Sequence, residues 1–389
     1  MKNDKDYMAL AIAAADEGRF TAHPNPRVGC VLVKGGAVVG TGFHLQTGHG
    51  HAEANALAVA GDAARGATAY VTLEPCSFAG RTPSCAKALV EAGVSRVVAA
   101  LADPHPRNGG AGFDLLRDAG VDVEVGPLAA AAHALNPGHF RRFAGGLPYV
   151  RCKLAMTLDG KTALANGASQ WITSPAARRD VQRLRAMSGA IVTGVQTVID
   201  DDPQLTVRAD EIDVTHAALA AQVPRLRAVL DSNLRMPRTA KMATADVLAY
   251  CTEDAARGEG GDLACQVVGV PGQPHRLDLA AVLRDLAQRD CNEVLFECGA
   301  TLAGSLLAAG LADELIVYTA PKLMGDGARS LLKLPEVDTM GDLIELEFTD
   351  VQRIGPDLRL TATPLKKPLT KPLAGKSLAG KRVGPDQTS

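Results

Sequence analysis

The chain has 389 residues, of which 47% are hydrophobic and only 4% aromatic, and its formal net charge at pH 7 is −2. This length exceeds what one hydrophobic core usually supports, so we expect two domains. A nearly neutral chain with few aromatic rings lacks the basic surface and stacking platforms of a dedicated nucleic-acid-binding protein.

Helical and strand-like segments alternate through the first 147 residues. Residues 6–18 have an apolar face at helical spacing, and two apolar runs flank the hairpin signal Lys34-Gly35-Gly36. The expected helices are 6–18, about 52–60, 85–93 and 113–120, and the expected strands are 28–33, 37–43, 67–73, 96–102 and 121–125. Such alternation predicts an α/β sandwich around one sheet.

A Gly-Gly-Leu-Pro stretch at 145–148 is the best candidate boundary, so we expect domains at 1–147 and 148–365. A second α/β alternation follows, in which Ser174 is the N-cap of a helix. The expected helices are 174–187, 277–289 and 302–310, and the expected strands are 149–156, 189–195, 225–231, 246–252, 293–299 and 314–321. Residues 366–389 are rich in Lys, Pro and Gly without a sustained period, which is typical of a disordered basic tail.

His51, Cys76 and Cys85 are candidate ligands of one catalytic zinc ion. Cys76 follows an expected strand and Cys85 opens an expected helix, so both thiols are expected at one edge of the sheet. The N–H groups and the dipole at a helix N-terminus favour the thiolate, which is the form that binds metal. One His and two Cys leave a fourth tetrahedral position for water, as in catalytic rather than structural zinc sites.

Glu53 is the candidate acid/base group beside this site. Zinc lowers the pKa of its bound water to roughly 7, and removal of an exocyclic amine also needs a group that moves a proton to the leaving nitrogen. An H-x-E pattern followed by P-C…C is typical of zinc nucleobase deaminases, in which the Glu is not a ligand. Residues two apart on a regular helix point to opposite sides, so His51 must lie at or just before the helix start.

Three stretches, HPNPRVGCVLVKGGAVVGTGFH, GHAEANAL and VTLEPCSFAGRTPSC, resemble the deaminase half of the bifunctional RibD family of riboflavin biosynthesis. The resemblance implies a cytidine-deaminase-like three-layer α/β/α domain acting on 2,5-diamino-6-ribosylamino-4(3H)-pyrimidinone 5′-phosphate. The implied contacts to this substrate are Asn25 and His44 at the base and Arg81 and Thr82 at the phosphate. Two positions depart from the family pattern, because Phe78 stands where His is common and Asn108 replaces an apolar residue.

The second half carries no G-x-G-x-x-G between a strand and a helix, yet three of its stretches resemble the reductase half of the same family. These stretches are KLAMTLDGKTALANGASQWITS, TGVQTVIDDDPQLTVR and FECGATLAGSLL. The resemblance implies a dihydrofolate-reductase-like α/β domain in which NADPH reduces the ribosyl group, giving 5-amino-6-ribitylamino-uracil 5′-phosphate. The implied NADPH residues are Ala155, Trp171, Thr197, Asp201, Ser232, Gly299, Ala300 and Thr301. The implied substrate residues are Lys153, Ser169, Arg185, Leu205, Arg208 and Glu297.

Elementary chemistry agrees with several of these implied roles. The Gly299 turn between a strand and a helix offers backbone N–H groups to a phosphate, and Trp171 can stack on a flat ring. The planar forks of Arg185 and Arg208 suit a phosphate. Without the resemblance, Arg185 would be interpreted as solvated helix surface, and the Asp200–Asp202 run as a polar turn or a weak cation site.

A small pyrimidine nucleotide, rather than nucleic acid or membrane, is thus the expected partner. The N-terminal stretch carries acids through its apolar residues, unlike a signal peptide, and no uncharged run reaches transmembrane length. We expect a cytoplasmic homo-oligomer, a dimer or a tetramer, with reduced cysteines. Two alternatives stay open: a nucleic-acid deaminase that uses the basic tail for binding, and a scaffold whose structural zinc takes His49 as a fourth ligand.

Overall fold

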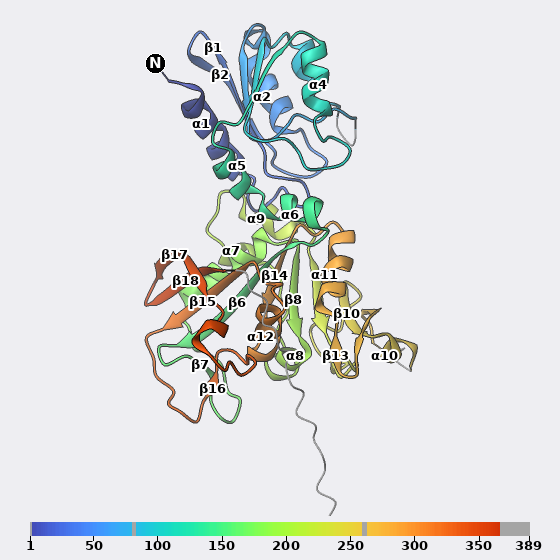
Figure 1. The fold of residues 1–389 in the computed structure, drawn as a ribbon, viewed down its shortest axis with the longest axis vertical. Helices are drawn as coiled ribbons and strands as arrows, with labels where there is room; N and C mark the ends of the chain where they lie inside the picture. Colours follow the sequence, from blue (N-terminus) through green and yellow to red (C-terminus); the bar gives the residue numbers. More distant parts are fainter. Residues whose placement is uncertain (1, 80–82, 259–262, 366–389) are drawn as a thin grey trace, which may run out of the picture.

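The computed structural model describes residues 2–79, 83–258 and 263–365. Over these residues the chain forms two α/β units that lie end to end along the long axis of the molecule (Figure 1). The first unit contains a five-stranded sheet and the second a nine-stranded sheet. Helix α6 (Pro137–Gly145) lies where the units meet and leads into β6 (Tyr149–Thr157), the first strand of the second unit.

The sheet of the first unit has the strand order β2-β1-β3-β4-β5. β1 pairs antiparallel with both β2 and β3, whereas β3, β4 and β5 run parallel. Gly35 and Gly36 turn the β1–β2 hairpin with φ of 58° and 82°, a conformation that favours glycine. The strands are β1 (Gly29–Lys34), β2 (Ala37–Phe43), β3 (Thr68–Val71), β4 (Arg96–Ala99) and β5 (Asp122–Val125). The helices, besides α6, are α1 (Asp4–Asp16), α2 (Ala52–Ala60), α3 (Cys85–Glu91), α4 (Ala111–Asp118) and α5 (Ala129–Leu135).

Helices cover both faces of this sheet. α2, α3 and α4 form one core with strand residues such as Val71 and Val97. α1 and α5 form a second core with the neighbouring strand residues Tyr70 and Val98. Successive strand residues point to opposite faces of a sheet, so these two cores lie on its two sides. The unit therefore has the predicted three-layer α/β/α arrangement.

The sheet of the second unit has the order β11-β10-β9-β8-β14-β6-β15-β18-β17, parallel up to β15 and antiparallel over the last two pairs. Besides β6, its strands are β8 (Ala190–Gly194), β9 (Leu226–Leu230), β10 (Val247–Thr252), β11 (Gln266–Val270), β14 (Glu293–Glu297), β15 (Glu314–Ala320), β17 (Leu346–Ile354) and β18 (Asp357–Pro364). Two short pairs lie outside it, β7 (Lys161–Ala163) with β16 (Arg329–Ser330) and β12 (Gly272–Gln273) with β13 (Arg276–Leu277). The helices are α7 (Pro175–Met187), α8 (Val195–Asp201), α9 (Ala217–Gln222), α10 (Glu253–Arg257), α11 (Leu279–Gln288) and α12 (Ala300–Ala308).

The central strand β14 is packed from both sides. Val294 and Phe296 belong to the core that α11 and α12 complete, and Leu295 belongs to the core under α7. All three side chains are fully buried. β14 is therefore a fixed element from its first residue, Glu293, to its last, Glu297.

The predicted α/β fold and most predicted elements are confirmed, including the cap of α7, where the Ser174 side chain accepts the N–H of Ala177. Three local features differ from the sequence-based predictions. The aspartate run is the end of α8 and not a simple polar turn, because Asp202 caps that helix with φ 42°. α5 and α6 occupy much of the segment around the predicted boundary, and β17 and β18 extend the sheet beyond the last predicted strand.

The β17–β18 hairpin escapes a period-2 search for a physical reason. Its register shifts between Phe348 and Asp350, so a bulge interrupts the alternation of side chains, and β17 is mostly exposed. The predicted tail, 366–389, lies outside the described residues. Within the described ranges, no helix combines the length and apolar character needed to span a membrane.

Candidate functional site

The three predicted metal ligands converge at one edge of the first sheet. His51 is the N-cap of α2, Cys76 follows β3 in the chain, and Cys85 is the first residue of α3. Nδ1 of His51 lies 3.3 Å from Sγ of Cys85 and 3.7 Å from Sγ of Cys76. The extended backbone of His51 (φ −72°, ψ 168°) confirms that this side chain leaves the chain before the helix begins.

These distances fit a zinc ion. Zn–S bonds of about 2.3 Å and Zn–N bonds of about 2.0 Å at tetrahedral angles put N and S roughly 3.5 Å apart. The ligand atoms of His51, Cys76 and Cys85 all lie within 4.8 Å of one another. His49, the alternative fourth ligand, is exposed and does not belong to this group of described residues. The donor set is therefore that of a site with one open position.

The local structure favours a thiolate at Cys76. The backbone N–H of Cys85 donates to Sγ of Cys76 at 3.3 Å, and the hydroxyl of Ser84 donates to the carbonyl oxygen of Cys76 at 2.8 Å. A hydrogen bond from the Cys85 thiol is the main cause that lowers the pKa of Cys76 to about 4. Ser84 also caps α3, so the cap and the ligand loop are held together.

Glu53 lies in the first turn of α2 with its side chain buried. Burial raises the pKa of Glu53 to about 7, although the nearby charge of His51 opposes the shift. The side chain of Cys85 also favours the charged carboxylate of Glu53, which further opposes the effect of burial on its pKa. A carboxyl group with a pKa near neutrality can both take up and release a proton.

Asn25 and His44 meet beside this cluster. Nδ1 of His44 lies 3.1 Å from the carbonyl oxygen of Gly50, which can only accept, so Nδ1 carries the proton. Burial lowers the pKa of His44 to about 4, which leaves the ring neutral and Nε2 able to accept from the amide nitrogen of Asn25 at 3.1 Å. The other two predicted contacts, Arg81 and Thr82, lie outside the described residues.

The two departures from the family pattern have definite surroundings. The side-chain oxygen of the buried Asn108 accepts the N–H of Ser77 at 3.0 Å, which ties the loop after Cys76 to the loop before α4. The guanidinium of Arg107 lies 4.0 Å from the centre of the Phe78 ring, a cation–π distance. Asn108 therefore positions a loop that carries a predicted ligand.

A large cleft occupies the second unit at the carboxyl ends of its parallel strands. It has a volume of about 1450 Å³ and receives residues that follow β8, β9 and β14 in the chain. Ligands of open parallel sheets bind at this edge. All predicted reductase residues line it: Lys153, Ala155, Ser169, Trp171, Arg185, Thr197, Asp201, Leu205, Arg208, Ser232, Glu297, Gly299, Ala300 and Thr301.

Arg185 is not solvated surface, contrary to the interpretation without the family resemblance. Its side chain is 13% exposed and forms a bidentate ion pair with Glu297, at 2.5 and 3.1 Å. Nη1 donates to the carbonyl oxygen of Thr206 at 3.0 Å. Burial lowers the pKa of Lys153, and the charge of Glu297 opposes this shift. The cleft floor is thus a mixed-charge cluster of Lys153, Arg185 and Glu297.

Arg208 has different surroundings, because its side chain is 48% exposed and pairs with Glu211 three residues along the chain. The hydroxyl of Ser169 donates to the carboxylate of Asp201 at 3.2 Å. Trp171 is 64% exposed at the cleft, and the guanidinium of Arg178 lies 4.4 Å from its ring centre. Its exposed ring is therefore available to a planar ligand.

One group of cleft residues was not predicted from the sequence. They come from the loop after β9, from the β12–β13 hairpin and from residues near β16. The cationic and polar members are Asn233, Arg235, Lys241, His275, Arg276, Arg329, Ser330 and Lys333. No spacing motif links these distant segments, and only the topology brings them to one edge.

Two family models match the chain. The model of the cytidine and deoxycytidylate deaminase zinc-binding region matches residues 1–101, which include all three metal-ligand candidates. The model of the RibD C-terminal domain matches residues 148–360.

Curated relatives and solved structures extend this similarity to nearly the whole chain. The riboflavin biosynthesis protein RibD of Escherichia coli is 46% identical over 360 residues, covering 92% of this chain and 98% of that protein. RibD of Haemophilus influenzae is 44% identical, covering 92% and 96%. The structure of Acinetobacter baumannii RibD, form 1, superposes with a TM-score of 0.84 at 41% identity, covering 93% of this chain and 99% of that one. A Thermotoga maritima deaminase/reductase gives a TM-score of 0.76 at 28% identity, covering 93% and 98%. The chain therefore belongs to the RibD family of riboflavin biosynthesis, and its two units are a deaminase domain and a reductase domain.

Proposed function

We propose that the first domain, residues 1–147, removes an exocyclic amine from 2,5-diamino-6-ribosylamino-4(3H)-pyrimidinone 5′-phosphate. The observation that carries this proposal is the convergence of His51, Cys76 and Cys85 beside a buried Glu53. One zinc ion held by these three residues would activate a water for attack on the ring carbon that bears the amine. Glu53 takes the proton of that water and delivers it to the leaving nitrogen, so that ammonia departs.

The base and the phosphate of this substrate need separate contacts. The neutral His44 ring orients the Asn25 amide, which binds the polar edge of the pyrimidine. Arg81 and Thr82 bind the 5′-phosphate, a role that suits the planar guanidinium of an arginine. Because the substrate is held at both ends, its amine-bearing carbon faces Glu53.

The second domain, residues 148–365, reduces the ribosyl group of the deaminated product to ribityl. NADPH in the cleft would supply the hydride to C1′ of the opened sugar. The turn at Gly299, Ala300 and Thr301 offers backbone N–H groups to the cofactor phosphates, and Trp171 stacks on a flat ring of the cofactor. Ala155, Thr197, Asp201 and Ser232 line the same cofactor site.

The deaminated substrate occupies the rest of the cleft. Arg185 and Arg208 bind its phosphate, and Ser169, Leu205 and Glu297 hold the remainder. Lys153 lies beside Glu297 and can deliver a proton to the reduced sugar. The residues thus bind, orient and protonate, and the redox chemistry belongs to the cofactor.

A coupled assay tests both halves of the proposal. The zinc-loaded chain and NADPH are mixed with the diaminopyrimidine nucleotide, and ammonia release and NADPH absorbance are followed together. We expect NADPH oxidation only when the nucleotide is present, after ammonia has appeared. NADPH oxidation without ammonia release would contradict the assigned order, and turnover of cytidine or RNA in its place would favour a different deaminase.

A further inference from the structure

The loop that carries Asn25 is held by the reductase domain. This segment, residues 20–27, connects α1 to β1, and here it is called the substrate loop. Asn292 donates its amide N–H to the carbonyl oxygen of Pro24 at 2.8 Å, and Arg225 donates to the carbonyl oxygen of Phe20 at 2.9 Å. Both donors belong to the second domain. The substrate loop is therefore clamped from outside the deaminase domain.

The ring of His23 packs against a glycine of the reductase domain. A Cβ atom on Gly189 would lie 2.3 Å from Cε1 of His23, which is far inside van der Waals contact. Any other residue at 189 would therefore displace the ring. This contact lies two residues from Asn25, so the packing between the domains reaches the substrate loop directly.

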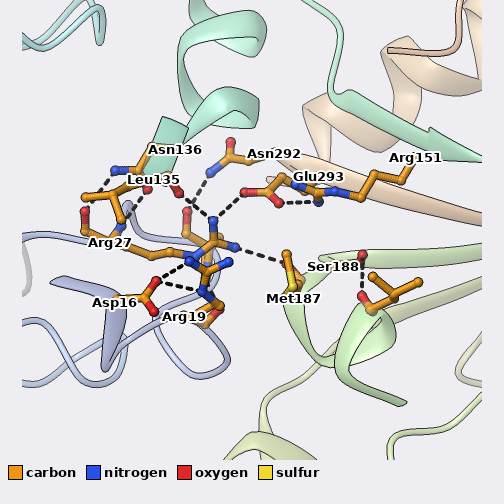
Figure 2. Close-up of polar contacts among 12 residues, drawn as sticks. Asp16, Arg19, Arg27, Leu135, Asn136, Arg151, Met187, Ser188, Asn292 and Glu293 are labelled. Carbon is orange, nitrogen blue, oxygen red and sulfur yellow. Dashed lines mark hydrogen bonds and ion pairs between the residues drawn. The ribbon is translucent and has the colours of Figure 1, made fainter. Parts of the chain in front are cut away.

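Arg27 is the main link between the domains (Figure 2). Its side chain is 11% exposed, and Nη1 forms an ion pair with Glu293 at 2.9 Å. Nη1 also donates to the carbonyl oxygen of Leu135 at 2.5 Å, and Nη2 donates to that of Met187 at 3.2 Å. The backbone of Arg27 is fixed as well, because the Asn136 side chain accepts its N–H at 2.7 Å and donates to its carbonyl oxygen at 2.8 Å.

The reductase side of this link is rigid. Glu293 is the first residue of β14 and accepts from Arg151 on β6 as well as from Arg27 (Figure 2). Burial alone would raise the pKa of Glu293, but the charges of Arg27 and Arg151 outweigh it and hold the pKa at about 2. Met187 ends α7, the helix that carries Arg185. Arg27 is thus anchored to two core elements of the reductase domain.

We propose that Arg27 is a positioning residue of the deaminase site, which places Asn25 for the pyrimidine by fixing the substrate loop on the reductase domain. Asn25 and Glu293 line the same small cavity, of about 20 Å³. The residue that is positioned therefore lies close to the carboxylate that anchors Arg27. The inference rests on the proposed deaminase function. It makes the affinity of the deaminase for its substrate depend on a carboxylate of the reductase domain.

Two full-length, zinc-loaded variants test the link from its two sides, Arg27→Met and Glu293→Gln. We expect each to raise the deaminase KM for the diaminopyrimidine nucleotide on the order of tenfold, with kcat within about twofold, because substrate binding loses a positioned contact. Zinc content should stay at the wild-type level, since neither residue touches the ligands. Arg27→Lys keeps the charge but loses the fork, so it should restore KM only in part. The double variant should have a KM no higher than the worse single variant, because both changes break one link.

Arg141→Met is the matched control. Arg141 joins α6 to Asp313 of the reductase domain at 2.5 Å, so its loss also breaks an ion pair between the domains. It has no hydrogen bond to the substrate loop, and the deaminase KM should therefore stay at the wild-type value. An equal rise of KM in this control would overturn the inference, because general loosening of the interface would then explain the effect.

The remaining outcomes separate this inference from the function on which it rests. If the wild-type chain deaminates and Glu293→Gln, folded and zinc-loaded, keeps the wild-type KM, Arg27 has no positioning role. If Arg27→Met fails to fold, the KM of Glu293→Gln decides the question. If the wild-type chain itself releases no ammonia from the nucleotide, the proposed function is wrong.

Discussion

Alanine substitution of Arg185 and Arg208 separates substrate binding from support of the cleft floor. We assign both arginines to the substrate phosphate, yet their surroundings differ. Arg185 is 13% exposed and Glu297 is 11% exposed, whereas Arg208 is 48% exposed beside Glu211. Arg185→Ala therefore leaves a buried carboxylate without its bidentate partner, and Arg208→Ala leaves a carboxylate that water can reach.

The sizes of the two effects follow from this burial. Loss of one partner from a buried ion pair costs about 3 kcal/mol or more, and a domain of this size shifts its Tm by roughly 2–4 °C per kcal/mol. Arg185→Ala should thus lower the Tm by roughly 6–12 °C, while Arg208→Ala should stay within about 0.5 kcal/mol of the parent. If Arg208 binds phosphate, its loss removes a charge-assisted hydrogen bond of about 1.5–3 kcal/mol, which raises the substrate KM about 10- to 100-fold.

Thermal unfolding and steady-state kinetics, with NADPH and the deaminated nucleotide varied separately, measure both effects in the full-length chain. Arg179→Ala is the control, because Arg179 is an exposed residue of the same helix. Arg185→Ala with an unchanged Tm would refute the structural reasoning. A rise confined to the KM for NADPH would show that these arginines bind a cofactor phosphate instead.

Three further predictions concern the acid/base group, the zinc ligands and the pH dependence of stability. Glu53→Gln should keep the fold and the zinc but nearly abolish deamination, with reduction of pre-deaminated substrate intact; loss of zinc in this variant would contradict a pure proton-transfer role. Cys76→Ser and Cys85→Ser should each lower the zinc content, because a hydroxyl is a poorer zinc ligand than a thiolate, and one full zinc in both variants by elemental analysis would refute the ligand set. The folded-state pKa of Glu293 is about 2 against 4.5 ordinarily, so its contribution to stability is present above about pH 4.5 and is lost as the pH falls toward 2. Urea midpoints between about pH 6 and pH 3 should therefore fall less steeply in Arg27→Met than in the parent, and parallel curves would exclude this contribution.

The zinc cluster could be predicted from the sequence because its geometry is local. His51 and Cys85 lie at helix starts that have their own signals, the glycines before His51 and Ser84 as N-cap of α3, and Cys76 lies in the loop between β3 and α3. β3, which lies between His51 and Cys76 in the chain, is mostly buried, and its apolar residues predict a strand. Three short motifs with correct boundaries therefore place three side chains at one edge without knowledge of the rest of the fold.

The contacts between the domains could not be predicted in this way. Arg27 and Met187 are 160 residues apart, and Asn292 and Pro24 are 268 residues apart, with no periodicity or spacing that relates them. The sequence alone does not distinguish a buried arginine from an exposed one, so it does not show that Arg27 and Arg185 are buried. Only the tertiary structure shows which charged side chains are buried.

The position of β14 explains how the fusion of two enzymes can matter to the first of them. The strand rises about 3.3 Å per residue, so the Cα atoms of Glu293 and Glu297 are roughly 13 Å apart. Glu293 meets Arg27 at the interface, and Glu297 meets Arg185 at the floor of the reductase cleft. The residues between them are buried on both faces and cannot shift without disturbing two cores. The substrate loop is therefore held by the reductase core through Glu293 as well as by Leu135 and Asn136 of its own domain.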